Sequence, residues 1–513
     1  MKLVLKKSVN IVVVITLITM LCKIFGFFKN SVLAYYYGTS YVIDAYVMTF
    51  SIGTITSSWI AGLIGNFTPK FKEIEANSGR KEALIFSGQV FLFVLFLVVL
   101  LIVLLEIFSP IIVRLIAPGF EYDSYSLTVA FFRIYCISIF FYAIFRFSQE
   151  FLNCNQNHLA AVAPDLLMSS FCIIAIVVSS ILGNYILIMG YVIAILMQGG
   201  VTFICSKRLG LLTNVKLAWN DNVQGLIKMA VPVFFSDALS NINNLVDKIF
   251  ASRLNAGTIA ALDYANTMKD FAYQVGTIGI ATMMFPVISK LWADGNVKEF
   301  KDKIMQSVSM FSVVYIPLIV AIIYLGDLVI KIVFQRGAFT SESTIITTNA
   351  FIVYSVGLIP MVYRLVFYKA FFAMQQTNNV LFVSFLNVLL NVILNIILVN
   401  RLGYLGLVIA TTTASIICMP LNFWVYSRSI SGLEYRDFFI TFFKCLLAGL
   451  VMFVAMFCIR NGLNLFLLDT LLTKLLVLAL TGIFGIMIYC VICTWLKVDE
   501  IKRLLSTITW LKF

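Results

Sequence analysis

The sequence has little charge and almost no histidine. Only 12% of its 513 residues are Asp, Glu, Lys or Arg, and His158 is the single histidine. Ordinary soluble domains are about 25% charged, so this composition excludes a soluble globular protein. A single histidine also excludes a zinc site or a catalytic triad built on several histidines. We therefore expect no firm metal site and no cofactor.

The ten cysteines lie mostly within apolar stretches. Cys490 and Cys493 form the pattern C-x-x-C, but their neighbours are aliphatic and no second ligand pair is present. Cysteines in such surroundings are typically buried thiols that behave as small hydrophobic side chains. The pattern is therefore not interpreted as a metal site.

Long hydrophobic stretches dominate the chain, which is 61% hydrophobic with a mean hydropathy of +1.00. A membrane-spanning helix needs about 20 apolar residues, and about fourteen stretches reach that length. They are 9–37, 41–68, 83–109, 125–149, 159–182, 185–205, 224–252, 257–288, 302–326, 343–374, 379–399, 404–426, 438–459 and 470–496. The sequence predicts an all-α polytopic membrane protein with about fourteen transmembrane helices.

Positive charge is concentrated in short connectors. The formal net charge is +13, and the strongly basic connectors alternate along the chain, beginning with Lys2–Lys7 and Lys70–Lys81. Cytoplasmic loops carry an excess of Lys and Arg, so both termini are predicted to face the cytoplasm. The first apolar stretch is far longer than a signal-peptide core, and we expect it to stay as a helix. No basic region is interleaved with aromatic residues, and we expect no nucleic-acid partner.

The chain repeats itself at a nearly constant spacing. The matching pairs are Gly38-Thr39 with Gly257-Thr258, Asp44 with Asp263, Phe151–Asn157 with Phe372–Asn378, and Gly190 with Gly406. The repeat predicts an N-terminal lobe of six helices over 1–210 and a C-terminal lobe of six helices over 211–430. An extra helix pair and a basic tail follow over 431–513. Transporters with parallel repeats bind cargo between the halves and alternate access by rocking.

Charged side chains interrupt the apolar stretches. Lys23 and Lys29 lie in the first one, although a lysine at the bilayer centre costs roughly 2.5–3.5 kcal/mol. We interpret them as part of a polar path for negatively charged cargo. The predicted cavity set is Lys23, Lys29, Asn30, Asp44, Ser57, Asp263, Thr267, Asp270 and Arg364. For the Ser, Thr and Asn positions, the alternative is interhelical hydrogen bonding that only stabilises the bundle.

A second polar set indicates a cation site. It consists of Asp237, Asn391, Asn395 and Thr411. A carboxylate with several neutral oxygens suits a hard cation such as Na⁺. The simpler interpretation is a ladder of asparagines that packs helices together.

Several ordered motifs resemble one family. They are Lys23–Asn30 (KIFGFFKN), Ala34, Gly38, Asp44-Ala45-Tyr46, Ala117–Phe120, Ala163-Pro164, Phe285-Pro286, Phe334–Thr340 and Tyr354–Leu358. Together the motifs resemble those of the MurJ (MviN) lipid II flippases of the multidrug/oligosaccharidyl-lipid/polysaccharide exporter superfamily. The resemblance implies fourteen helices, two lobes in a V, a polyprenyl-tail groove in 431–513, and a place in the bacterial cytoplasmic membrane. It also implies an undecaprenyl-pyrophosphate-linked glycan as cargo, and cell-wall synthesis proteins as partners.

The sequence departs from the family pattern in its cations. Lys23 and Lys29 stand where the family typically has arginine, Asp270 stands where glutamate is usual, and Ser57 and Thr267 align with typical arginines. The first hypothesis is a flippase that moves lipid II by alternating access, aided by membrane potential or Na⁺, as a monomer surrounded by membrane lipids. The missing arginines keep open a flippase for a capsule, exopolysaccharide or teichoic-type precursor.

Three other classes fit the sequence less well. A drug/cation antiporter of the same superfamily predicts an acidic cavity, whereas the first helix contributes lysines. A membrane enzyme needs a convergent set of catalytic groups, which the sequence does not offer, so we predict no enzymatic activity. A structural scaffold would not need lysines within the membrane.

Overall fold

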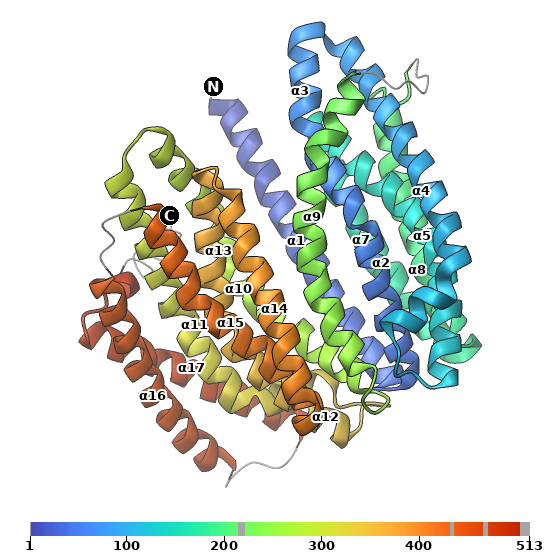
Figure 1. Ribbon diagram of the computed structural model, residues 1–513. Coiled ribbons are helices and arrows are strands. Elements are labelled where there is room, and N and C mark those ends of the chain that lie inside the picture. The colour runs from blue at the N-terminus through green and yellow to red at the C-terminus, as the bar shows by residue number, and fades with distance from the viewer. Residues whose placement is uncertain (1, 214–220, 431–434, 465–469, 503–513) are drawn as a thin grey trace. The chain divides into compact units, whose positions relative to one another are not determined.

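The computed structural model describes residues 2–213, 221–430, 435–464 and 470–502, and every regular element in these ranges is an α-helix (Figure 1). Within the helices, the side chains of 2–13, 16, 61, 229–240, 278–283 and 464 lie outside the description. An α-helix pairs its backbone N–H and C=O groups within the same segment, as a chain in lipid requires. The contacts divide the chain into two compact units.

The first unit comprises Met1–Ala260 and Arg336–Thr340. Its helices are α1 (Lys2–Tyr37), α2 (Tyr41–Gly65), α3 (Phe67–Ser78), α4 (Arg80–Ile116), α5 (Tyr122–Cys154), α6 (His158–Val162), α7 (Pro164–Leu182), α8 (Tyr185–Arg208) and α9 (Asp221–Ala251). Helix α5 packs against α2, α4 and α8, and α9 packs against α2. At the centre, the Tyr135 and Tyr191 rings stack at 5.7 Å, and a side chain at Gly53 would overlap the Tyr135 ring.

Helix α3 lies beside the apolar bundle as a short amphipathic helix. It buries Phe67, Phe71 and Ile74, while Lys70 and Lys72 pair with acids one turn later. The basic connector after the second predicted stretch is therefore a folded helix whose apolar face packs on α4 and α5.

The second unit comprises Ala261–Gln335 and Ser341–Phe513. Its helices are α10 (Thr258–Ala293, whose first residues belong to the first unit), α11 (Val297–Phe334), α12 (Ser341–Val356), α13 (Leu358–Ala373), α14 (Thr377–Leu402), α15 (Tyr404–Ser429), α16 (Arg436–Asn464) and α17 (Leu471–Trp495). Helix α11 contacts α12, α13, α16 and α17, so the final helix pair packs on this unit through one long helix.

The prediction of an all-helical polytopic membrane protein is confirmed. Every predicted stretch coincides with helix, and 343–374 is formed by α12 and α13, which meet at Gly357 with a bend of 42°. Among the described residues, 11 helices are long and apolar enough to cross a membrane, or up to 12 if the bent pair is one span. The count of about fourteen stays a prediction, because the search for spans covers only the described residues, and α9 and α10 both contain residues outside the description.

The predicted lobes are defined by the internal sequence repeat, whereas the two compact units are defined by contacts between residues. The division into 1–210, 211–430 and 431–513 therefore stays a prediction. Helix α9, which the repeat places in the second lobe, packs on α2 in the first unit.

Candidate functional site

The lysines of α1 lie within an apolar helix that is long enough to span a membrane. Lys23 and Lys29 both fall inside the candidate span Leu17–Tyr37. Lys23 is exposed from the protein, and Lys29 and Asn30 are partly exposed. The first unit therefore presents two ammonium groups on the surface of a membrane-spanning helix, where burial in lipid alone would be costly.

A third lysine of this unit reaches the polar face of α2. Lys248 of α9 donates a hydrogen bond to Ser51 Oγ at 2.7 Å. Ser57, two turns further along α2, is 7% exposed, so it is buried in the protein interior of this unit. Lys248 was not predicted as a site residue. The period of polar residues along α9 is the signal that could have found it.

Asp44 is buried at the start of α2, and its carboxylate binds backbone. One carboxylate oxygen accepts from Gly257 N at 2.5 Å and the other from Ala260 N at 2.8 Å. Ala260 lies in the first turn of α10 and Gly257 directly precedes the helix. A carboxylate at a helix start satisfies unpaired donors and complements the helix dipole. The structure thus places Asp44 as the cap of α10. Its predicted role in cargo binding stays a prediction.

The turn between α1 and α2 makes close backbone contacts at the same end of the first unit. Ala338 N donates to Tyr35 O at 2.8 Å, and a side chain at Gly38 would overlap the Ala338 carbonyl. Gly257 has φ +89°, and a side chain there would overlap the Thr39 carbonyl. Three segments that are distant in the sequence therefore meet at one junction. The backbones approach so closely at Gly38 and Gly257 that only glycine fits there.

In the second unit, three neighbours on α10 form a polar cluster. Lys269 Nζ lies 3.2 Å from Asp270 Oδ1 and donates to Asn266 Oδ1 at 2.6 Å. Asn266 in turn donates to Asp270 Oδ2 at 3.2 Å. The Asp270 side chain is 45% exposed, whereas that of Lys269 is 13% exposed. The carboxylate is therefore accessible, but its charge is partly neutralised within the helix.

Other predicted residues of this unit lie on α10 and α13. Thr267 and Asp263 are partly exposed on the same helix. Arg364 of α13 has its guanidinium 5.9 Å from the Tyr368 ring.

The predicted cation ligands on α14 and α15 form hydrogen bonds with one another. Asn391 donates to Thr411 Oγ1 at 3.1 Å, and Asn395 donates to Asn391 Oδ1 at 3.1 Å. Both asparagines are fully buried. This arrangement is typical of polar packing between helices. The side chain of Asp237 lies outside the described residues, so the cation site stays a prediction. Among those described, no group of three or more His, Cys, Asp or Glu is placed to bind a metal ion.

The sequence is similar to proteins of one known family. A family model described as "Lipid II flippase MurJ" matches residues 33–492. A "Probable lipid II flippase MurJ" of Buchnera aphidicola subsp. Acyrthosiphon pisum is 24% identical over 474 residues, which cover 90% of this chain and 92% of the relative. One of Rhizobium meliloti is 27% identical over 372 residues, which cover 70% and 69%.

Solved structures show the same fold. One described as "Lipid II flippase MurJ, inward closed conformation" has a TM-score of 0.80 at 22% identity, covering 95% of this chain and 100% of the other. An inward-facing multidrug resistance MATE family transporter of the MOP superfamily has a TM-score of 0.66 at 14% identity, covering 80% and 96%.

Proposed function

Because the chain belongs to the lipid II flippase (MurJ) family, we propose that it moves lipid II from the cytoplasmic to the outer leaflet by alternating access. The resemblance stated from the motifs is confirmed by the family match over residues 33–492, and this match carries the proposal. Flippases are transporters, and the prediction that the chain is not an enzyme agrees with its family. It is a multi-pass membrane protein of a bacterial flippase family.

The lysines supply the charge that such a cargo needs. Lipid II carries a diphosphate, and ammonium groups bind phosphate as point charges, without the bidentate geometry of arginine. Lys23 and Lys29 lie within a membrane-length helix, and Lys248 of the same unit points at the polar face of α2. We expect these residues to attract the diphosphate, while the polyprenyl tail stays in lipid along the final helix pair.

A flippase for another lipid-linked glycan is the second candidate. Ser57 and Thr267 are neutral where the family typically has arginine, and Ser57 is buried. A precursor with a different head group would meet fewer cations at these positions. Capsule, exopolysaccharide and teichoic-type precursors belong to this class.

Energy coupling and topology complete the proposal. Moving one elementary charge through 100 mV is worth roughly 2.3 kcal/mol, so membrane potential is a sufficient source for a charged cargo. Na⁺ binding by Asp237, Asn391, Asn395 and Thr411 is the alternative source. We further propose both termini in the cytoplasm, a bacterial cytoplasmic-membrane location, action as a monomer, and contact with cell-wall synthesis proteins.

Complementation tests the function. The gene is expressed in a bacterium whose own lipid II flippase is depleted, and growth and lipid II accumulation are followed. We expect the wild type to restore growth and to lower lipid II, and Lys23→Ala and Asp270→Ala to fail. An exposed lysine outside the predicted cavity provides the matched control, Lys207→Ala on α8. If an inserted wild-type chain does not restore growth, the lipid II assignment is wrong and the second candidate takes its place.

A further inference from the structure

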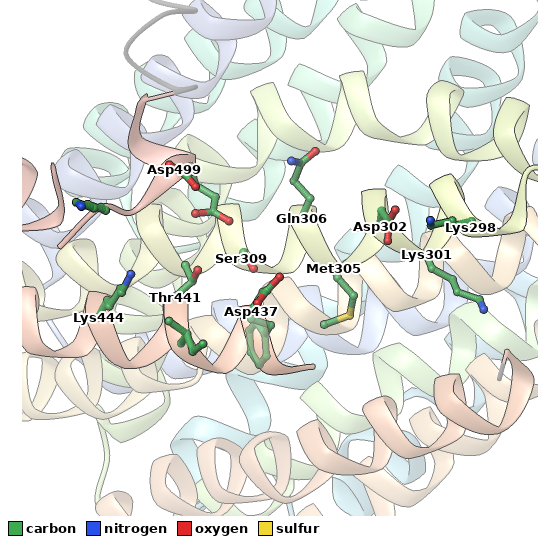
Figure 2. Close-up of a pocket in the computed structure, with 14 residues that line it drawn as sticks. Lys298, Lys301, Asp302, Met305, Gln306, Ser309, Asp437, Thr441, Lys444 and Asp499 are labelled. Carbon is green, nitrogen blue, oxygen red and sulfur yellow. The ribbon is translucent and has the colours of Figure 1, made fainter. Parts of the chain in front are cut away.

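A polar cavity of about 720 Å³ lies within the second unit, apart from the predicted cargo residues. It is lined by the first turns of α11, the first turns of α16 and the segment that follows α17. Figure 2 shows Lys298, Asp302, Gln306 and Ser309 along one helix, and Asp437, Thr441 and Lys444 along another. Helices α11, α16 and α17 contact one another. Val498 and Ile501, in the segment after α17, are buried in one apolar cluster with residues of α11 and α16, so the lining is held by packed elements.

The lining carries opposite charges that do not neutralise each other directly. Its charged side chains include Lys298, Lys444 and Lys497 on one hand and Asp302, Asp437 and Glu500 on the other. None of these six forms an ion pair within 4.0 Å with any residue in the described part of the chain. A ligand that carries both signs of charge would contact both sets at once.

The cavity lies at the ends of membrane-length helices, where we expect the membrane surface. Trp495, at the end of α17, is 77% exposed, and tryptophan is enriched at membrane–water interfaces. From the cavity, α16 continues with an apolar exposed face on which Phe443, Leu447 and Leu450 are 64%, 51% and 66% exposed. Side chains at this spacing lie on one side of a helix. A head group in the cavity would therefore have an apolar helix face beside it for its acyl chains.

We propose that this cavity binds the phosphoethanolamine head group of a zwitterionic phospholipid. The lysines bind the phosphate. The carboxylates accept hydrogen bonds from the primary ammonium, which has three N–H donors. The equal numbers of lysines and carboxylates disfavour a purely anionic ligand, because each carboxylate would repel it. The volume is within the range of about 300–1,000 Å³ that is usual for small-ligand sites. The bound lipid would join α11, α16 and α17, and this role does not depend on the identity of the cargo.

Native mass spectrometry of the purified full-length protein tests the proposal. The probes are phosphatidylethanolamine, phosphatidylcholine and phosphatidylglycerol with identical acyl chains. We expect the first to bind roughly tenfold more tightly than the second, whose quaternary ammonium has no N–H donor. Equal binding of these two lipids, or tighter binding of phosphatidylglycerol, would overturn the proposal.

Two variants locate the binding. Lys444→Gln removes a charge on the phosphate side and Asp437→Asn removes one on the ammonium side. Each should weaken phosphatidylethanolamine binding by about tenfold. Asp437→Asn should also narrow the difference between phosphatidylethanolamine and phosphatidylcholine, which a merely structural defect would not do. Lys207→Gln, in the first unit, is the matched control and should bind like the wild type. If neither cavity variant changes binding while both elute as folded protein, the lipid binds elsewhere and the proposal is wrong.

Discussion

The cap that Asp44 forms on α10 leads to a graded stability prediction. Asp44 is 3% exposed and accepts hydrogen bonds from Gly257 N and Ala260 N. Asp44→Ala removes both acceptors. Loss of an N-cap costs about 0.5–2 kcal/mol, and a buried donor left without a partner costs about 1–3 kcal/mol. We therefore expect Asp44→Ala to lower the free energy of unfolding by about 2–4 kcal/mol.

A conservative variant separates the cap from the charge. Asp44→Asn keeps one oxygen that can accept from one of the two N–H groups, so its loss should be about half as large. The measurement is thermal unfolding of the purified protein in detergent, where we expect Asp44→Ala to lower the apparent Tm by about 3–8 °C. Asp123→Ala is the matched control, because Asp123 also lies in the first turn of a helix but is exposed. If Asp44→Ala lowers Tm no more than Asp123→Ala does, the carboxylate does not stabilise the start of α10.

Further predictions concern the final helix pair, the glycine junction and the cargo path. Arg460 of α16 donates to both oxygens of Asp327 of α11, at 3.1 and 2.8 Å. A double-mutant cycle with Arg460→Met and Asp327→Asn should give a coupling energy of about 1–3 kcal/mol for this partly buried pair. A value near zero would show that this ion pair does not stabilise the packing of α16 on α11. Gly257→Ala should destabilise the protein by more than Gly295→Ala, by about 2 kcal/mol in unfolding experiments, because both have positive φ but only Gly257 faces a backbone carbonyl; equal losses would show that the junction relaxes. Lys23→Arg should retain rescue in the complementation assay, whereas Lys23→Ala should lose it, since charge and not side-chain shape is what the first hypothesis requires; rescue by both would remove Lys23 from the cargo path.

Much of the fold could be predicted from the sequence because membrane helices have a local signal. About 20 consecutive apolar residues suffice to indicate a span, whatever lies elsewhere in the chain. The stretches 83–109 and 438–459 thus coincide with α4 and α16. The family was equally accessible, because ordered short motifs such as Lys23–Asn30 need no structure to be recognised.

The roles of individual polar residues were harder to predict, because their partners are distant in sequence. Asp44 fits a cavity lining by its spacing, yet its carboxylate binds the backbone of Gly257 and Ala260, which only the packing of the first unit brings to it. Asn391 and Asn395 fit a cation site by composition, but their amides donate to neighbouring oxygens on α14 and α15. A polar side chain in a sequence indicates that a partner is needed, without indicating which one.

The sequence by itself determined the membrane class, the helical architecture and the family of this protein, because apolar length and short motifs are properties of contiguous residues. Only the tertiary structure decided that Asp44 caps α10, that Arg460 binds Asp327, and that charges from α11, α16 and the segment after α17 surround one cavity. These features depend on contacts between segments far apart in the chain. Hydrogen bonds and ion pairs require their two groups to lie within a few ångströms of each other in space. The number of residues between the two groups in the sequence does not determine this distance.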